Sequence, residues 1–149
     1  MPLYTEMPQL LAQVRIKRLG TAHEKNDVKW LRLMCDYSAE GVWNHRGAAT
    51  SLARYPISDA LAARILAWQN WYECMLGDET GAARWSDFFG TDFSEAGRTL
   101  AQAVKQELPD WTVVYFDDAR WKEVYQQGLD RTDPKVRALY EYEMDRQPK

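Results

Sequence analysis

The stretch from Ser58 to Leu76, SDALAARILAWQNWYECML, constrains the fold more than any other part of the chain. Ser58 suits the cap that accepts a hydrogen bond from the first free N–H groups of a helix, and Asp59 suits the positive end of the helix dipole. Gly77 favours the left-handed backbone that ends a helix. The apolar residues recur at three- and four-residue steps: Leu61, Ile65, Trp68, Tyr72 and Met75. The pattern predicts a central helix over 58–76, around which other elements pack.

Two segments have the pattern of β-strands. Residues 28–37 (VKWLRLMCDY) alternate and place four apolar residues on one face: Leu31, Leu33, Cys35 and Tyr37. Residues 111–116 (WTVVYF) are β-branched or aromatic throughout. Because helices separate these two strands in the chain, we expect a crossover that makes them parallel neighbours. The expected fold class is α+β and largely helical, with a small sheet of two or three strands packed around the central helix.

Three further helices are expected after the central one. Ser94 suits the cap of a helix that ends before Pro109, and a short helix ends at Gly128. Asp133 suits the cap of a last helix, because Pro134 would occupy its first position. The inward stripe of this last helix would consist of Val136, Leu139, Tyr140 and Met144.

Two segments have no single interpretation. Residues 38–56 carry scattered Gly, Asn and Ala without periodicity and are typical of a long loop, which in a compact domain is often functional. Residues 4–19 fit a helix through Leu10, Leu11 and Val14, and fit an edge strand through the alternation of Val14 and Ile16 with basic residues.

Length and composition set the class of protein. The 149 residues predict one globular domain, 1–149, with a packed core. The start of the chain lacks a signal pattern and no apolar run is long enough to span a bilayer, so we expect a cytoplasmic protein without a membrane partner. Cys35 and Cys74 are expected to be reduced core thiols.

Charge is unevenly distributed along the chain. The net charge is −3, but residues 77–118 contain nine acidic and three basic side chains, a balance of −6. A chain with this acidic segment is a poor nucleic-acid binder and suits a basic partner. The alternative interpretation is a solvated acidic face without a partner.

If the two strands are parallel, their carboxyl ends bring polar residues together. Asp36 would lie near Asp117 and Asp118, with His45 and Arg46 arriving from the long loop. Carboxylates beside a histidine suit acid–base chemistry, so one alternative is a small hydrolase or transferase using Asp36, His45 and Asp117. Aspartate is also a common turn former after a strand. The chain lacks zinc-ligand spacings, a phosphate-binding loop and a dinucleotide fingerprint, so neither a metal nor a cofactor is expected.

Tryptophan is the more informative residue type. The chain has seven, and Trp is enriched among the residues that dominate binding energy at protein interfaces. Trp43 on the long loop and Trp85 in the acidic segment are the candidates for exposed anchors. The expected partner-binding residues are Trp43, His45, Arg46, Asp78, Glu79, Trp85, Asp87, Asp117 and Asp118.

Three stretches together resemble a known group of proteins: LRLMCDYSAEGVWN, PISDALAARILAWQNWYECML and FSEAGRTLAQAVKQELPDWTVVYFD. They resemble small bacterial cytosolic proteins that are similar to the immunity proteins encoded beside polymorphic or contact-delivered toxins. The likeness covers residues 28–118. It implies a protein that binds and inhibits its toxin in the cytoplasm. Together with the acidic segment, it favours a protein that occludes a basic toxin or enzyme domain over a protein that is itself an enzyme. The hydrolase or transferase, and a regulatory subunit of another enzyme, are the alternatives.

Overall fold

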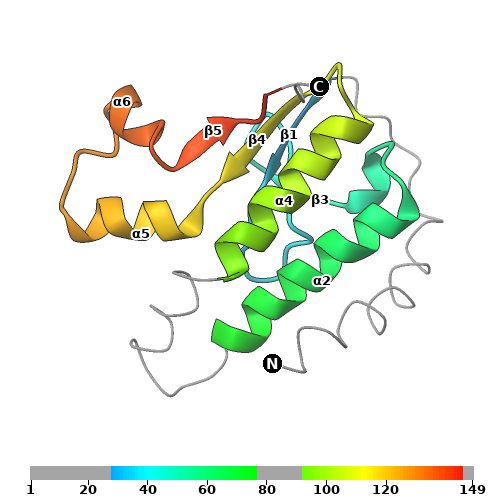
Figure 1. Cartoon of the computed structure of the whole chain (residues 1–149), viewed down its shortest axis with the longest axis horizontal. Helices are drawn as coiled ribbons and strands as arrows, with labels where there is room; N and C mark the ends of the chain where they lie inside the picture. The colour runs from blue at the N-terminus through cyan, green and yellow to red at the C-terminus, as the bar shows by residue number, and fades with distance from the viewer. Residues whose placement is uncertain (1–27, 77–91, 146–149) are drawn as a thin grey trace.

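The computed structural model describes residues 28–76 and 92–145. Within these ranges, five strands form one mixed sheet in the order β3-β2-β1-β4-β5, and two long helices lie side by side across one of its faces (Figure 1). The elements are β1 (Trp30–Leu33), β2 (Val42–Trp43), β3 (Ala49–Thr50), η2 (Leu52–Arg54), α2 (Asp59–Leu76), α4 (Asp92–Glu107), β4 (Thr112–Phe116), α5 (Asp118–Gln126), α6 (Pro134–Arg137) and β5 (Glu141–Glu143). The α+β class predicted from the sequence is confirmed.

The centre of the sheet is the predicted parallel pair, β1 and β4. Leu31 lies opposite Val113 and Leu33 opposite Tyr115, and all four side chains are completely buried under the helices. All other strand pairs are antiparallel. The strand predicted over 28–37 is shorter than expected, because Val28 is 41% exposed and pairing stops at Leu33.

The central helix is confirmed as α2, and its start is tied to the end of α4. The hydroxyl oxygen of Ser58 accepts a hydrogen bond from the N–H of Leu61, as the capping pattern predicts. The same hydroxyl and the N–H of Ser58 donate to the carboxylate of Glu107 at distances of 2.8 and 2.7 Å. One end of α2 is thereby fixed to the last residue of α4.

Helix α4 begins earlier than expected. It starts at Asp92, so Ser94 lies inside its first turn and does not cap it. The Ser94 hydroxyl oxygen instead accepts a hydrogen bond from the N–H of Ala119 in α5. Phe93 is completely buried and stacks on the indole of Trp68, with 5.1 Å between ring centroids. The first turn of α4 therefore belongs to the core.

Two expectations about the sheet and the last helix are wrong. The sheet has five strands because residues 38–56, expected to be a loop, contain β2, β3 and η2. The helix capped by Asp133 lasts only from Pro134 to Arg137, and β5 follows it. Leu139, expected on an inward stripe, is 45% exposed. Pairing with β4 satisfies the backbone groups of β5, and the residues on either side of β5, Tyr140 and Met144, are buried.

The sheet face opposite the helices is polar at its centre. Arg32 of β1 forms an ion pair with Glu141 of β5 at 3.0 Å, and its guanidinium lies over the ring of Trp43 in β2.

Residues 4–19, which the sequence fits to either a helix or an edge strand, lie outside the described residues.

Candidate functional site

The carboxyl ends of β1 and β4 enclose a hollow of about 280 Å³, which we call the carboxyl-end pocket. Four elements contribute to it: the segment that follows β1, the C-terminal half of α2, the end of β4 and the first turns of α5. Its lining consists of Met34, Cys35, Asp36, Tyr72, Phe116, Asp118 and Trp121. Most of this wall is apolar or aromatic, and two carboxyl groups interrupt it.

Asp118 is the buried carboxyl group of the pocket. It is the first residue of α5 and only 8% exposed. Within the described residues, its Oδ2 atom is buried and has no hydrogen-bond partner. Burial, together with the nearby charges of Asp117 and Asp36, raises the pKa of Asp118 well above its ordinary value. The wall of the pocket therefore contains a carboxyl group that keeps its proton to a higher pH than an ordinary aspartate does.

Asp117, the neighbouring residue, has a structural role. Its Oδ1 atom accepts a hydrogen bond from the N–H of Arg120 and so caps α5. Its Oδ2 atom accepts one from the hydroxyl of Tyr142 on β5 at 3.1 Å. Burial and the charge of Asp117 raise the pKa of Tyr142 to about 12, so the tyrosine stays protonated and keeps donating.

The chain that follows β1 is held in place by α2. The side chain of Gln69 donates to the carbonyl oxygen of Asp36 at 2.5 Å, and the carboxylate of Glu73 accepts from the N–H of Ser38 at 2.8 Å. Asp36 itself is exposed at the pocket mouth. Within residues 28–76 and 92–145, no ion pair involves the acidic cluster, by which we mean Asp36, Glu73, Asp117 and Asp118.

Cys35 does not have the properties of a nucleophile. Its side chain is buried, and burial together with the charges of Asp118, Glu73 and Asp36 raises the pKa of its thiol well above the ordinary value. The expectation of a free core thiol is therefore confirmed at Cys35. Cys74, also expected in the core, is exposed, because it lies on the solvent side of α2.

The structure does not bring His45 to the carboxylates. Strand β2 runs antiparallel to β1, with Trp43 opposite Arg32, so the turn that carries His45 and Arg46 lies at the amino end of β1. Asn44 closes this turn by accepting hydrogen bonds from the N–H groups of Arg46 and Ala48. The catalytic grouping of Asp36, His45 and Asp117 is therefore not assembled.

Trp43 packs within the protein. Its indole N–H donates to the carbonyl oxygen of Met34 at 2.8 Å, and its ring supports the guanidinium of Arg32. The other expected contact residues, Asp78, Glu79, Trp85 and Asp87, lie outside the described residues. Of the predicted site residues, the structure thus brings together Asp117 and Asp118 and places Trp43, His45 and Arg46 elsewhere.

The comparison with protein families bears directly on this arrangement. Residues 29–118 match the family described as Serratia CdiI immunity protein-like. The chain belongs to this immunity protein-like family. The match confirms the resemblance seen in the sequence, and its range contains every lining residue of the carboxyl-end pocket except Trp121. No curated protein and no solved structure shows significant similarity to the chain.

Sequence reasoning missed the apolar part of the pocket. Tyr72 fits the core stripe of the central helix, and Trp121 fits a stripe of the short helix after β4. These two side chains line the same pocket because of where α5 lies relative to α2, and no local sequence pattern predicts that position. The available signal is a Trp three residues after two consecutive aspartates at a strand end.

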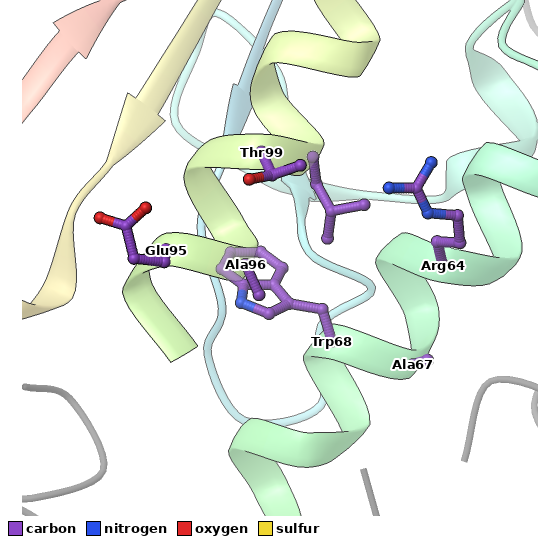
Figure 2. Close-up of a pocket in the computed structure, with 7 residues that line it drawn as sticks. Arg64, Ala67, Trp68, Glu95, Ala96 and Thr99 are labelled. Carbon is purple, nitrogen blue, oxygen red and sulfur yellow. The ribbon is translucent and has the colours of Figure 1, made fainter. Parts of the chain in front are cut away.

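A second hollow of about 290 Å³ lies between α2 and α4. Figure 2 shows the indole of Trp68 reaching from α2 to Ala96 of α4, with Arg64 and Glu95 at opposite ends. The floor is thus a core side chain, and the rim carries charges of both signs. Within the described residues, no group of three or more His, Cys, Asp or Glu is arranged to hold a metal ion, and no helix is long and apolar enough to cross a membrane.

Proposed function

We propose that this chain is an immunity protein that binds a cognate bacterial toxin in the cytoplasm and occludes its active site. The observation that carries the proposal is the family match over residues 29–118. The matched range extends from β1 to the first residue of α5, so it includes the central sheet pair, both long helices and almost all of the carboxyl-end pocket.

Charge supports a basic partner. The segment 77–118 has a balance of −6, and the part of it from Asp92 to Asp118 contains six acidic and two basic residues. One of those two bases, Lys105, is buried and donates to the carbonyl oxygen of Trp111, so it contributes little to the surface. Toxins that act on nucleic acids present basic clefts, and an acidic surface would both attract such a cleft and cover it.

No specific observation favours the alternative of a small hydrolase or transferase. Its histidine lies at the opposite end of β1, and Asp117 is engaged as a helix cap and as the acceptor for Tyr142. A regulatory subunit would also bind a protein partner, but that partner would not be a toxin. The experiment below distinguishes the two functions.

The test is co-expression in bacteria with the product of the adjacent open reading frame. Cells that express the toxin domain alone should stop growing, and cells that also express this chain should survive. The two proteins should elute together in size-exclusion chromatography. A toxin domain of the same delivery class from another strain serves as the control, and it should kill despite the presence of this chain. Complex formation without protection would support the regulatory subunit, and neither binding nor protection would overturn the proposal.

A further inference from the structure

We infer that the carboxyl-end pocket receives a single arginine side chain of the partner, which pairs with Asp118. The inference rests on the proposed function for the identity of the partner, but the pocket itself can be tested without it. Three features support the inference: the size of the hollow, the unpartnered Oδ2 atom of Asp118 in its wall and the charges around its mouth.

The pocket has the size of an anchor site. Its volume of about 280 Å³ lies at the lower limit of roughly 300–1,000 Å³ for small-molecule sites. The walls contain Met34, Phe116 and the rings of Tyr72 and Trp121, which suit the apolar stem of a long side chain. Such pockets, filled by one side chain of a partner, are typical of binding hot spots.

One oxygen of the Asp118 carboxyl group, Oδ2, is buried and has no hydrogen-bond partner within the described residues. A buried polar atom without a hydrogen-bond partner destabilises a protein. A ligand that brings an N–H group to this oxygen would remove that penalty. The pocket therefore presents Oδ2 of Asp118 to a hydrogen-bond donor of a ligand.

The surrounding charges favour a cationic donor. Four titratable groups line the pocket: Cys35 and Asp36 after β1, Tyr72 on α2 and Asp118 on α5. The charge of Glu73 acts on Cys35, and that of Asp117 acts on Asp118. All of them are acids. No lysine or arginine of the described residues forms an ion pair with the acidic cluster. Two cations are nearby: Arg131 lies over the ring of Trp121, and the charge of Arg98 interacts with that of Asp117. The two carboxyl groups that line the pocket, Asp36 and Asp118, favour an incoming cation.

The aromatic walls favour arginine over lysine. A guanidinium is planar and weakly hydrated, and it stacks on aromatic faces while it donates to a carboxylate. The chain already uses this contact: the guanidinium of Arg131 lies 5.9 Å from the ring of Trp121 and 5.1 Å from that of Tyr125. A lysine ammonium is a compact, strongly hydrated charge and gains less from such walls.

Pairing with arginine requires Asp118 to release its proton. In the free protein, burial and the neighbouring carboxylates keep this carboxyl group neutral at a pH where aspartate is ordinarily charged. A bound guanidinium stabilises the charged form, so the pKa of Asp118 falls on binding. Affinity should therefore rise with pH and level off above the pKa that Asp118 has in the free protein.

The experiment uses the whole chain and n-butylguanidinium as the probe, followed by NMR. We expect millimolar binding with shift changes at Trp121, Tyr72 and the carboxyl carbon of Asp118. The neutral analogue n-butylurea should bind about tenfold more weakly or worse, and n-butylammonium should be weaker than the guanidinium. Equal binding of n-butylurea would overturn the inference, and equal or tighter binding of n-butylammonium would overturn the choice of arginine.

Two variants localise the probe. Asp118→Asn should reduce the affinity for n-butylguanidinium at least about tenfold and abolish its pH dependence, whereas Asp110→Asn, which removes an exposed carboxylate elsewhere, should change neither. Unchanged affinity in Asp118→Asn would overturn the inference. The pH dependence of the unmodified chain provides the same test without a variant, and a flat profile from pH 4.5 to 8 would contradict it.

The outcomes separate this inference from the proposed function. If the probe binds at Asp118 and the neighbouring toxin does not bind the chain, the proposed function fails and the pocket assignment stands. If the toxin is bound and neutralised equally well by Asp118→Asn, and the probe does not bind, the immunity function stands and the pocket assignment fails.

Discussion

Gly97 of α4 lies directly against the indole of Trp68 in α2. A Cβ atom at position 97 would lie 2.4 Å from Cζ2 of Trp68 and 2.6 Å from the hydroxyl oxygen of Tyr115. That hydroxyl donates to the carbonyl oxygen of Ser94 in the first turn of α4, so it is not free to move. Glycine inside a helix is intrinsically unfavourable, and here it allows the helix to approach both α2 and β4 closely.

Gly97→Ala should therefore destabilise the protein although alanine is the better helix former. We expect a decrease of about 1–3 kcal/mol in the free energy of unfolding, measured by urea denaturation, because the added methyl group forces Trp68 or Tyr115 out of position. Thr99→Ala, at an exposed position of the same helix, is the control and should be neutral or slightly stabilising. A stabilised Gly97→Ala variant would show that α4 can shift without penalty.

Trp68→Ala should produce the largest loss of stability. Trp68 is 1% exposed, stacks on Phe93 and donates its indole N–H to the carbonyl oxygen of Phe93 at 3.1 Å. Truncation should lower the free energy of unfolding by about 3–5 kcal/mol, which is a large part of the stability of a typical domain. Leu139→Ala, at an exposed position, should change it by no more than about 0.5 kcal/mol. Equal melting temperatures for the two variants would contradict this account of the core.

The elements that the sequence predicts well are those determined by near neighbours in the chain. The stripe of α2, the cap at Ser58 and the β-branched run of β4 all depend on residues within a few positions of one another. The short strands β2, β3 and β5 have two or three residues each, too few for any periodicity. They exist because a neighbouring strand offers hydrogen bonds, and that information lies far away in the chain.

The candidate site follows the same division. The approach of Asp36 to Asp118 is predictable from the parallel pairing of β1 and β4, because the carboxyl ends of parallel strands meet. The position of His45 is not, because it depends on β2 turning back along β1. The burial of Asp118, as opposed to Asp117, depends on the direction in which α5 leaves the sheet. Two consecutive aspartates therefore have different roles: Asp117 caps α5, and Asp118 lies in the wall of the pocket.

Glu141→Gln should destabilise the polar face of the sheet. The carboxylate of Glu141 pairs with Arg32 at 3.0 Å and with Arg137 at 2.9 Å. Arg32 is largely buried, and within the described residues its Nε atom has no hydrogen-bond partner, so loss of the carboxylate leaves a buried charge uncompensated. We expect a decrease of about 1–3 kcal/mol in the free energy of unfolding. Arg137→Gln removes only the exposed partner and should change it by less than about 1 kcal/mol. Equal effects of the two variants would contradict a special role for Arg32.

The raised pKa of Asp118 predicts a particular dependence of stability on pH. Because the folded state holds this proton more tightly than the unfolded chain, stability falls as pH rises from about 4, the ordinary pKa of aspartate, to the pKa in the folded protein. Asp118→Asn removes this contribution. As pH rises, the free energy of unfolding of the variant should therefore increase relative to that of the unmodified chain. Denaturation in urea at pH 4.5, 6 and 7.5 measures it, and Asp110→Asn should follow the unmodified chain. Parallel profiles for Asp118→Asn and the unmodified chain would refute the assignment.

The acidic segment, residues 77–118, should determine the rate of association with the partner. Charge reversal at Asp78, Glu79 and Asp87 should slow association with the neighbouring gene's product, and added salt should slow association of the unmodified chain more than it speeds dissociation. Reversal of the exposed Glu123, Glu143 and Asp145 changes the net charge equally but lies outside 77–118, so it should slow association less. If the ring of Trp85 is a buried anchor, Trp85→Ala should mainly accelerate dissociation and should weaken the binding free energy by about 2 kcal/mol or more. Binding kinetics at two salt concentrations decide between the interpretations. An association rate that neither salt nor the first set of reversals alters would mean that the segment is a solvated face.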